Sequence, residues 1–162
     1  MRRMVKYAVA ALAVVAATSG QAQAQTVRLT AVLSGSNETP GVLTGATGTA
    51  EVFVNMATQD VNYEIEIFNL PSGTTAGHFH IGGPGLAGPI VVDLAPTVNV
   101  SNDFSLKGKA TAASLRARPD QGIRTWEDFI QSLIGGQAYV NIHSAVNPGG
   151  EIRGQLTVAP EQ

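Results

Sequence analysis

The sequence predicts an all-β domain, an antiparallel Greek-key sandwich or barrel with one short helical insertion. Short runs of alternating apolar and polar residues recur along the chain, and Gly, Pro, Asn and Ser separate them. Only one segment has the three-to-four-residue apolar spacing of a helix. Hydrophobic residues make up 44% of the 162 residues and charged residues only 14%, a balance that favours a packed core over disorder.

The chain begins with a segment that we expect to be removed. Three basic residues precede an apolar run from Tyr7 to Thr18, and Ala22-Gln23-Ala24 follows as a small-residue cleavage pattern. These features are typical of a secretory signal peptide, and the run is too short to be a lasting transmembrane helix. The sequence therefore predicts a signal peptide over residues 1–24 and one exported domain over residues 25–162. We expect that domain in the periplasm or outside the cell, with no stable membrane insertion.

Charge and cysteine content exclude several classes of function. Removal of the signal peptide leaves seven basic residues against twelve acidic ones, a formal charge of −5. Such a chain lacks the concentration of Lys and Arg that phosphate binding needs, so no nucleic acid partner is expected. The absence of Cys excludes disulfides, thiolate metal sites and a cysteine nucleophile. No paired carboxylates or cofactor loop stand out either, which favours a binding protein over an enzyme without deciding the matter.

Three strands are predicted in the first half of the domain. They are Thr26–Ser34, Thr49–Asn55 and Asn62–Ile67. The third alternates most regularly, with apolar side chains on one face and polar ones on the other, as in a strand with one buried side. Residues 36–46 form a predicted loop, and residues 55–60 form a hairpin connection.

Five further strands and one helix are predicted after the turn at residues 70–73. The strands are His78–Ile81, Ile90–Leu94, Phe104–Ala110, Ala138–His143 and Glu151–Val158. The helix runs from about Thr125 to Ile134, with Thr125 as its N-cap and Asp128 three residues later. Its apolar stripe, which includes Trp126, is expected to pack in the core, and Gly135-Gly136 ends it.

All three histidines of the chain fall in two of the predicted strands. His78 and His80 are two residues apart, so their side chains leave the same face, with Cα atoms roughly 6.5–7 Å apart. His143 ends its strand on the face that also carries Tyr139 and Asn141. If the two strands are neighbours, His78, His80 and His143 converge on one ion, and three imidazoles are suited to Cu(II) or Zn(II).

Other readings of the same residues stay open. The histidines also fit hydrogen-bonded strand ends in an extracellular scaffold that binds a protein partner and no metal. For a metal site, the candidates to hold the imidazole N–H groups are Asp93, Asn141, Ser144 and Glu151. Glu151 and Arg153 are themselves expected to form a surface ion pair or to guard an edge strand.

Several motifs resemble the chordin-type (CHRD) domain family. They are Asn37-Glu38-Thr39-Pro40, then His78-Phe79-His80-Ile81 with the glycine-rich loop and Ile90-Val91-Val92, and above all the block from Ala138 to Leu156. The resemblance spans about Val27 to Val158, although Thr39-Pro40-Gly41 stands where the family more often has Val-Pro-Pro. It implies a β-barrel or immunoglobulin-like sandwich, and membership among the exported bacterial proteins of the family.

A looser similarity links the histidines to a redox site. The His-x-His pair with a later His is similar to part of the copper site of copper–zinc superoxide dismutases, which implies a superoxide-dismutase-like barrel. The chain lacks a Cys pair, a further His to bridge two metals and a zinc-binding loop. The sequence therefore predicts an exported protein that binds a single copper or zinc ion for sequestration or delivery. An interaction module and a dismutase-like redox protein are the alternatives.

Overall fold

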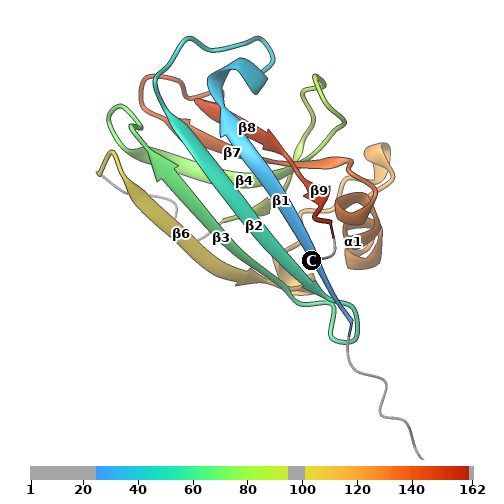
Figure 1. Cartoon of the computed structure of the whole chain (residues 1–162). Coiled ribbons are helices and arrows are strands. Elements are labelled where there is room, and N and C mark those ends of the chain that lie inside the picture. The colour runs from blue at the N-terminus through green and yellow to red at the C-terminus, as the bar shows by residue number, and fades with distance from the viewer. Residues whose placement is uncertain (1–24, 95–100, 161–162) are drawn as a thin grey trace, which may run out of the picture.

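The computed structural model describes residues 25–94 and 101–160 as one curved antiparallel sheet with a single α-helix (Figure 1). The strands are β1 (Thr26–Ser34), β2 (Thr47–Asn55), β3 (Val61–Phe68), β4 (Thr74–Ile81), β5 (Ile90–Asp93), β6 (Phe104–Ala110), β7 (Ala138–Ser144), β8 (Ile152–Gln155) and β9 (Thr157–Val158). The α-helix is α1 (Trp126–Ile134), and short 3-10 turns occupy Gly35–Asn37, Ala112–Ser114 and Pro119–Gln121. The predicted signal peptide lies outside the described residues.

The sheet forms a nearly closed barrel. Its strands follow the order β5-β4-β7-β8-β1-β2-β3-β6, and β9 adds a short pairing to β1. Consecutive strands β3 and β4 lie far apart in this order, so the turn at residues 70–73 carries the chain across the barrel. The predicted all-β fold with one short helix is confirmed.

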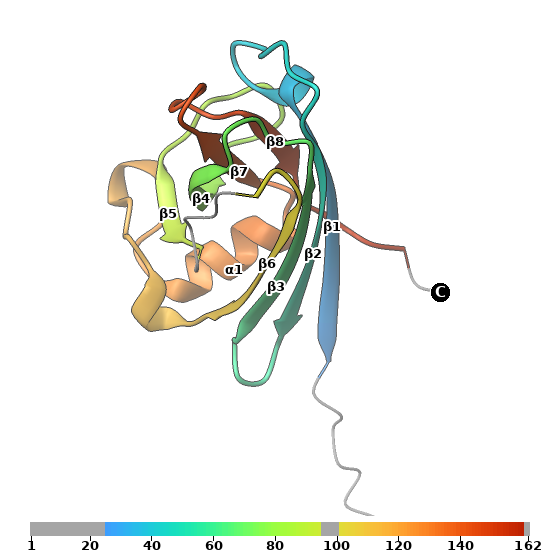
Figure 2. The same cartoon turned by 90° about the vertical axis from the view of Figure 1, so that its left-hand side faces the viewer.

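The barrel interior is filled by aliphatic and aromatic side chains from every long strand and from α1. The helix lies between strands β1–β3 and strands β4–β5 (Figure 2). Its Phe129 ring centroid is 5.9 Å from that of Phe79 on β4. Thr125 caps the helix as predicted, because its hydroxyl accepts from the Asp128 backbone and Asp128 accepts from the Thr125 backbone. No described helix is long and apolar enough to cross a membrane.

The largest differences from the predicted strands lie at β4 and at the end of the described chain. β4 begins at Thr74, four residues before the predicted start. Residues 74–77 are small or polar, so they gave no strand pattern, but they pair with β7. The last predicted strand is divided at Leu156: β8 pairs with β7, and β9 pairs with β1. All seven residues of β7 are buried, including Tyr139, Asn141 and His143 on the face of the candidate site.

Candidate metal centre

The pairing of β4 with β7 places the three histidines on one face of the sheet. The two strands run antiparallel, with His78 opposite Asn141 and His80 opposite Tyr139. Because directly paired residues of antiparallel strands point to the same side, these four side chains share the outer face with His143. The prediction that the two histidine-bearing strands are neighbours is confirmed.

The three imidazoles lie close enough to surround one ion. One nitrogen from each of His78, His80 and His143 lies within 4.8 Å of the other two. The shortest separation, 2.9 Å, joins His78 Nδ1 to His143 Nε2. An ion bonded to nitrogen at about 2.0–2.1 Å needs nitrogens about 3.3–4.1 Å apart, so small ring movements suffice to build the site.

Each imidazole is held by the nitrogen that faces away from this cluster. His80 Nδ1 lies 2.8 Å from the Gly88 carbonyl oxygen, and His143 Nδ1 lies 2.9 Å from that of Pro148. A carbonyl only accepts hydrogen bonds, so both Nδ1 atoms carry the proton and both Nε2 atoms present a lone pair to the cluster. His143 Nε2 accepts a hydrogen bond from His78 Nδ1, so binding of an ion by His78 Nδ1 requires that the proton leave that nitrogen. His78 Nε2 lies 3.5 Å from a carboxylate oxygen of Asp93. Such contacts are the usual means of fixing the tautomer of a metal-bound histidine.

One nitrogen that could bind a metal has no hydrogen-bond partner among the described residues. Within the part of the chain that the structure describes, His80 Nε2 is buried and makes no hydrogen bond. A buried polar atom without a partner is costly, and native proteins keep few of them. A cation held between the rings would satisfy this lone pair, so the residues present fit a metal ion.

Burial keeps the three rings neutral. His80 and His143 are only 7% and 8% exposed. Burial lowers the pKa of His78 from 6.5 to about 4, with a smaller effect from the neighbouring His143, and it lowers the pKa of His80 to about 4. It also lowers the pKa of His143. Because metals bind the neutral imidazole, the cluster is ready for an ion at neutral pH.

The partners of the outer nitrogens differ from most of those predicted. Of the four predicted side chains, Asp93 does lie beside an imidazole, and it also pairs with Arg116. Ser144 instead donates to Glu151, and Asn141 lies 3.5 Å from a Glu38 oxygen. The Gly88 and Pro148 carbonyls were missed because a backbone acceptor leaves no side-chain signal in the sequence.

A second feature that the sequence did not reveal is a stack of side chains beyond His80. The Tyr139 ring is nearly parallel to the His80 ring, at 15° with centroids 4.9 Å apart. The Arg153 guanidinium carbon lies 3.4 Å from the Tyr139 ring centroid. The expected surface pair of Glu151 with Arg153 is therefore wrong. Both side chains are buried, and Glu151 accepts hydrogen bonds from Ser144 and Asn147.

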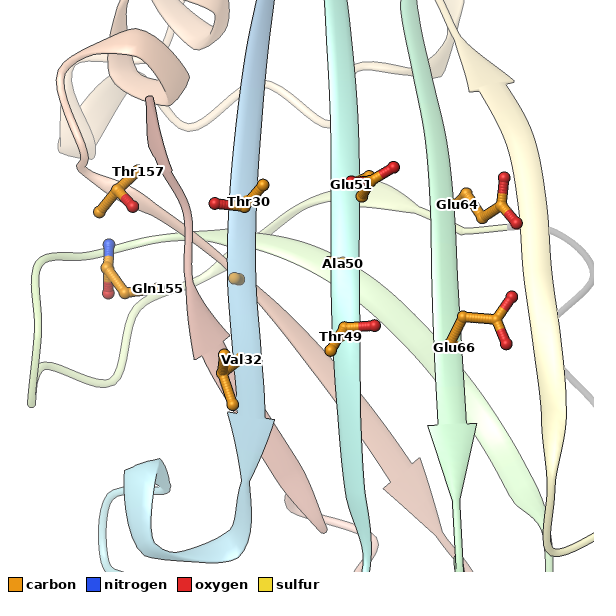
Figure 3. Close-up of a pocket in the computed structure, with 10 residues that line it drawn as sticks. Thr30, Val32, Thr49, Ala50, Glu51, Glu64, Glu66, Gln155 and Thr157 are labelled. Atoms are coloured by element: carbon orange, nitrogen blue, oxygen red, sulfur yellow. The ribbon is translucent and has the colours of Figure 1, made fainter. Parts of the chain in front are cut away.

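A groove elsewhere on the barrel has fewer side chains that are free to bind a ligand. It measures about 480 Å³ and lies over the outer face of β1–β3, with threonines on one side and carboxylates on the other (Figure 3). Glu51 and Glu64 pair with Arg28 and Lys107, and Glu66 accepts from the Ser105 hydroxyl. Its carboxylates are already in use, so the histidine cluster is the stronger candidate site.

Comparison with known proteins gives one match. The family model described as "CHRD domain" matches residues 29–156, a span that contains all three histidines and the strands that carry them. No curated protein and no solved structure matches the chain.

Proposed function

Since the chain belongs to the CHRD domain family, we propose that this member is an exported protein that binds one copper or zinc ion through His78, His80 and His143. Sequestration or delivery of the ion is the role that such a site would serve. The observation that carries the proposal is the buried, unpartnered Nε2 of His80 beside the two other neutral rings.

The donor set supports a mononuclear site. His80 and His143 offer Nε2, and His78 offers Nδ1, the atom that faces His143. Three neutral nitrogen donors suit copper and zinc, whereas Ca²⁺ and Mg²⁺ prefer oxygen. Among the described residues, this is the one group of three or more potential His, Cys, Asp or Glu ligands close enough to share an ion.

Metal titration of the purified protein tests the proposal. Untagged protein, recovered from cells that express the full-length chain, is loaded with Cu(II) or Zn(II), and its metal content and melting temperature are measured. We expect one ion per chain and a higher melting temperature, because an ion at a hundred times its Kd stabilises the native state by about 2.7 kcal/mol.

His80→Ala identifies the site. Loss of one of three ligands is expected to weaken binding by more than about a hundredfold. Thr75→Ala is the matched control, because Thr75 lies on the same strand, is exposed, and makes no hydrogen bond to any of the three histidines. If the His78/His80/His143 triple variant retains the wild-type affinity, the site is wrong, and an interaction scaffold becomes the better description.

Export is tested separately. The leader over residues 1–24 supports removal before Gln25. We expect the protein recovered outside the cytoplasm to begin at Gln25 by mass spectrometry. A full-length chain confined to the cytoplasm would contradict export without affecting the metal site.

A further inference from the structure

A buried cation stands beside the histidine cluster. Arg153 is 2% exposed, and its Nη2 donates to the Gly83 carbonyl oxygen at 3.0 Å. In residues 25–94 and 101–160, no carboxylate oxygen lies within 4 Å of its guanidinium. Its charge therefore acts in a region of low dielectric without a direct counterion.

The Tyr139 ring joins this cation to His80. β4 and β8 flank β7 on opposite sides, so Tyr139 on β7 is held between His80 on β4 and Arg153 on β8. The ring faces are in contact on both sides, which fixes the guanidinium one aromatic ring away from a proposed metal ligand. The face of an aromatic ring attracts a cation, so the stack is favourable in itself.

The other charges around the cluster belong to Asp93, Glu38 and Glu151, and the last is a buried carboxylate that forms no ion pair with Arg153 among the described residues. Asp93 lies beside His78, but its second carboxylate oxygen pairs with Arg116. The Glu38 carboxyl interacts electrostatically with Arg153. Burial raises the pKa of Glu38 to about 7, so this carboxyl is partly protonated at neutral pH. The three ligands are neutral, so the positive charge of Arg153 is not offset by the donor set.

We infer that Arg153 shifts the relative affinities of the three-histidine site in favour of a monovalent ion, Cu(I), against Cu(II) and Zn(II). The cost of burying an ion rises with the square of its charge, and the repulsion from Arg153 is twice as large for a divalent ion. Two unit charges about 8–10 Å apart inside a protein change an equilibrium constant by on the order of tenfold to thirtyfold. This inference rests on the proposed function, because it concerns which ion the same site takes.

Affinity measurements on Arg153 variants test the inference. Cu(I), Cu(II) and Zn(II) affinities are measured by competition with chromophoric chelators, Cu(I) under anaerobic conditions, on untagged protein from the full-length chain. In Arg153→Gln, the affinities for Cu(II) and Zn(II) should rise about tenfold to thirtyfold more than the Cu(I) affinity does. The reduction potential of the bound copper should fall in the same variant, which a purely structural role would not predict.

Two variants serve as controls. Arg153→Lys keeps the charge and should keep the wild-type ratios of the three affinities. Arg124→Gln removes an exposed charge near α1 and should leave all three affinities unchanged. Circular dichroism and thermal unfolding establish that each variant is folded, and Arg153→Met replaces Arg153→Gln if the latter is not.

The outcomes separate the two proposals. Equal shifts for all three ions, or the same shift in Arg124→Gln, would overturn the inference and leave the metal site intact. Failure of folded wild-type protein to bind any of the three ions would overturn the proposed function and the inference together.

Discussion

Burial shifts the pKa values of the histidines and of Glu38 in opposite directions. Burial lowers the pKa of His78 and His80 to about 4, and it raises the pKa of Glu38 from 4.5 to about 7 although the nearby Arg153 opposes the change. In each case, the native environment disfavours the charged form of the side chain. Both shifts make the stability depend on pH between about 4 and 7, with opposite signs: the histidines destabilise the fold as the pH falls, and Glu38 destabilises it as the pH rises.

The metal-free protein should lose stability as the pH falls from about 6.5 to about 4. Above pH 6.5, the histidines are neutral in both states. Below it, the unfolded chain binds protons that the folded His78 and His80 do not, so protonation favours unfolding. We expect a loss on the order of 1–2 kcal/mol per ring after allowance for partial solvent exposure, measured by urea denaturation with chelator present. The His78/His80/His143→Gln triple variant should flatten this pH dependence, and an unchanged slope would contradict the assignment.

Glu38→Gln should stabilise the protein at neutral and alkaline pH. The folded carboxyl resists ionisation up to about pH 7, whereas the unfolded one ionises near 4.5, so wild-type stability is lost as the pH rises through this window. The amide carries no such penalty. The difference in unfolding free energy between variant and wild type should widen from pH 4.5 to pH 7 by about 1 kcal/mol and then stay constant. A difference that does not change with pH would show that the carboxyl is not desolvated.

The sequence could predict the three ligands but not what surrounds them. His78 and His80 share a face because strand side chains alternate, and that rule needs no tertiary information. Arg153 and Glu38 depend on which strand lies beside β7 and on how a distant loop folds over it. Their burial is a property of the assembled sheet, which no local pattern of residues encodes.

At the level of elements, the loop from Gly82 to Pro89 orients His80. The Gly88 carbonyl accepts from His80 Nδ1, and the Gly88 amide donates to the Tyr139 hydroxyl at 3.0 Å. A Cβ atom at Gly88 would lie 1.5 Å from the Ile81 carbonyl oxygen, a clash with the backbone that no side-chain rotation can relieve. The loop can therefore take this path only with glycine at that position.

Gly88→Ala should lower both metal affinity and stability. The loop must move away from β4, which removes the acceptor that fixes the His80 tautomer, and we expect affinity to fall about tenfold to a hundredfold. Gly45→Ala is the matched control, because its added Cβ would meet nothing within 4 Å. Isothermal titration and urea denaturation measure both effects. Equal behaviour of the two variants would mean that the loop does not position His80.

Local signals account for the elements that were predicted correctly. The cap at Thr125 and the apolar stripe of α1 are written in consecutive residues, so the helix follows from the sequence alone. The division of the last strand into β8 and β9 depends instead on two different partner strands. Periodicity cannot reveal such a change of partner.

For the whole molecule, an ion would link two neighbouring strands on one side of the barrel. Two of its proposed ligands belong to β4 and the third to β7, while β2 and β3 lie on the other side of β1. Hydrogen exchange should therefore slow most in β4, β7 and the loop over residues 82–89 when Zn(II) is added. The β2–β3 hairpin should change least. An equal increase of protection in that hairpin would contradict a site confined to β4 and β7.

The contacts of His80 and His143 with main-chain oxygens have an evolutionary consequence. The Gly88 and Pro148 carbonyls belong to the polypeptide backbone, so no amino-acid replacement deletes those oxygen atoms. Homologous proteins can differ at nearly every neighbouring side chain and still direct Nε2 of both rings into the cluster, provided the loops keep their paths. Related metal centres should therefore be recognised by the conformation of these loops, which is conserved longer than the identity of the residues.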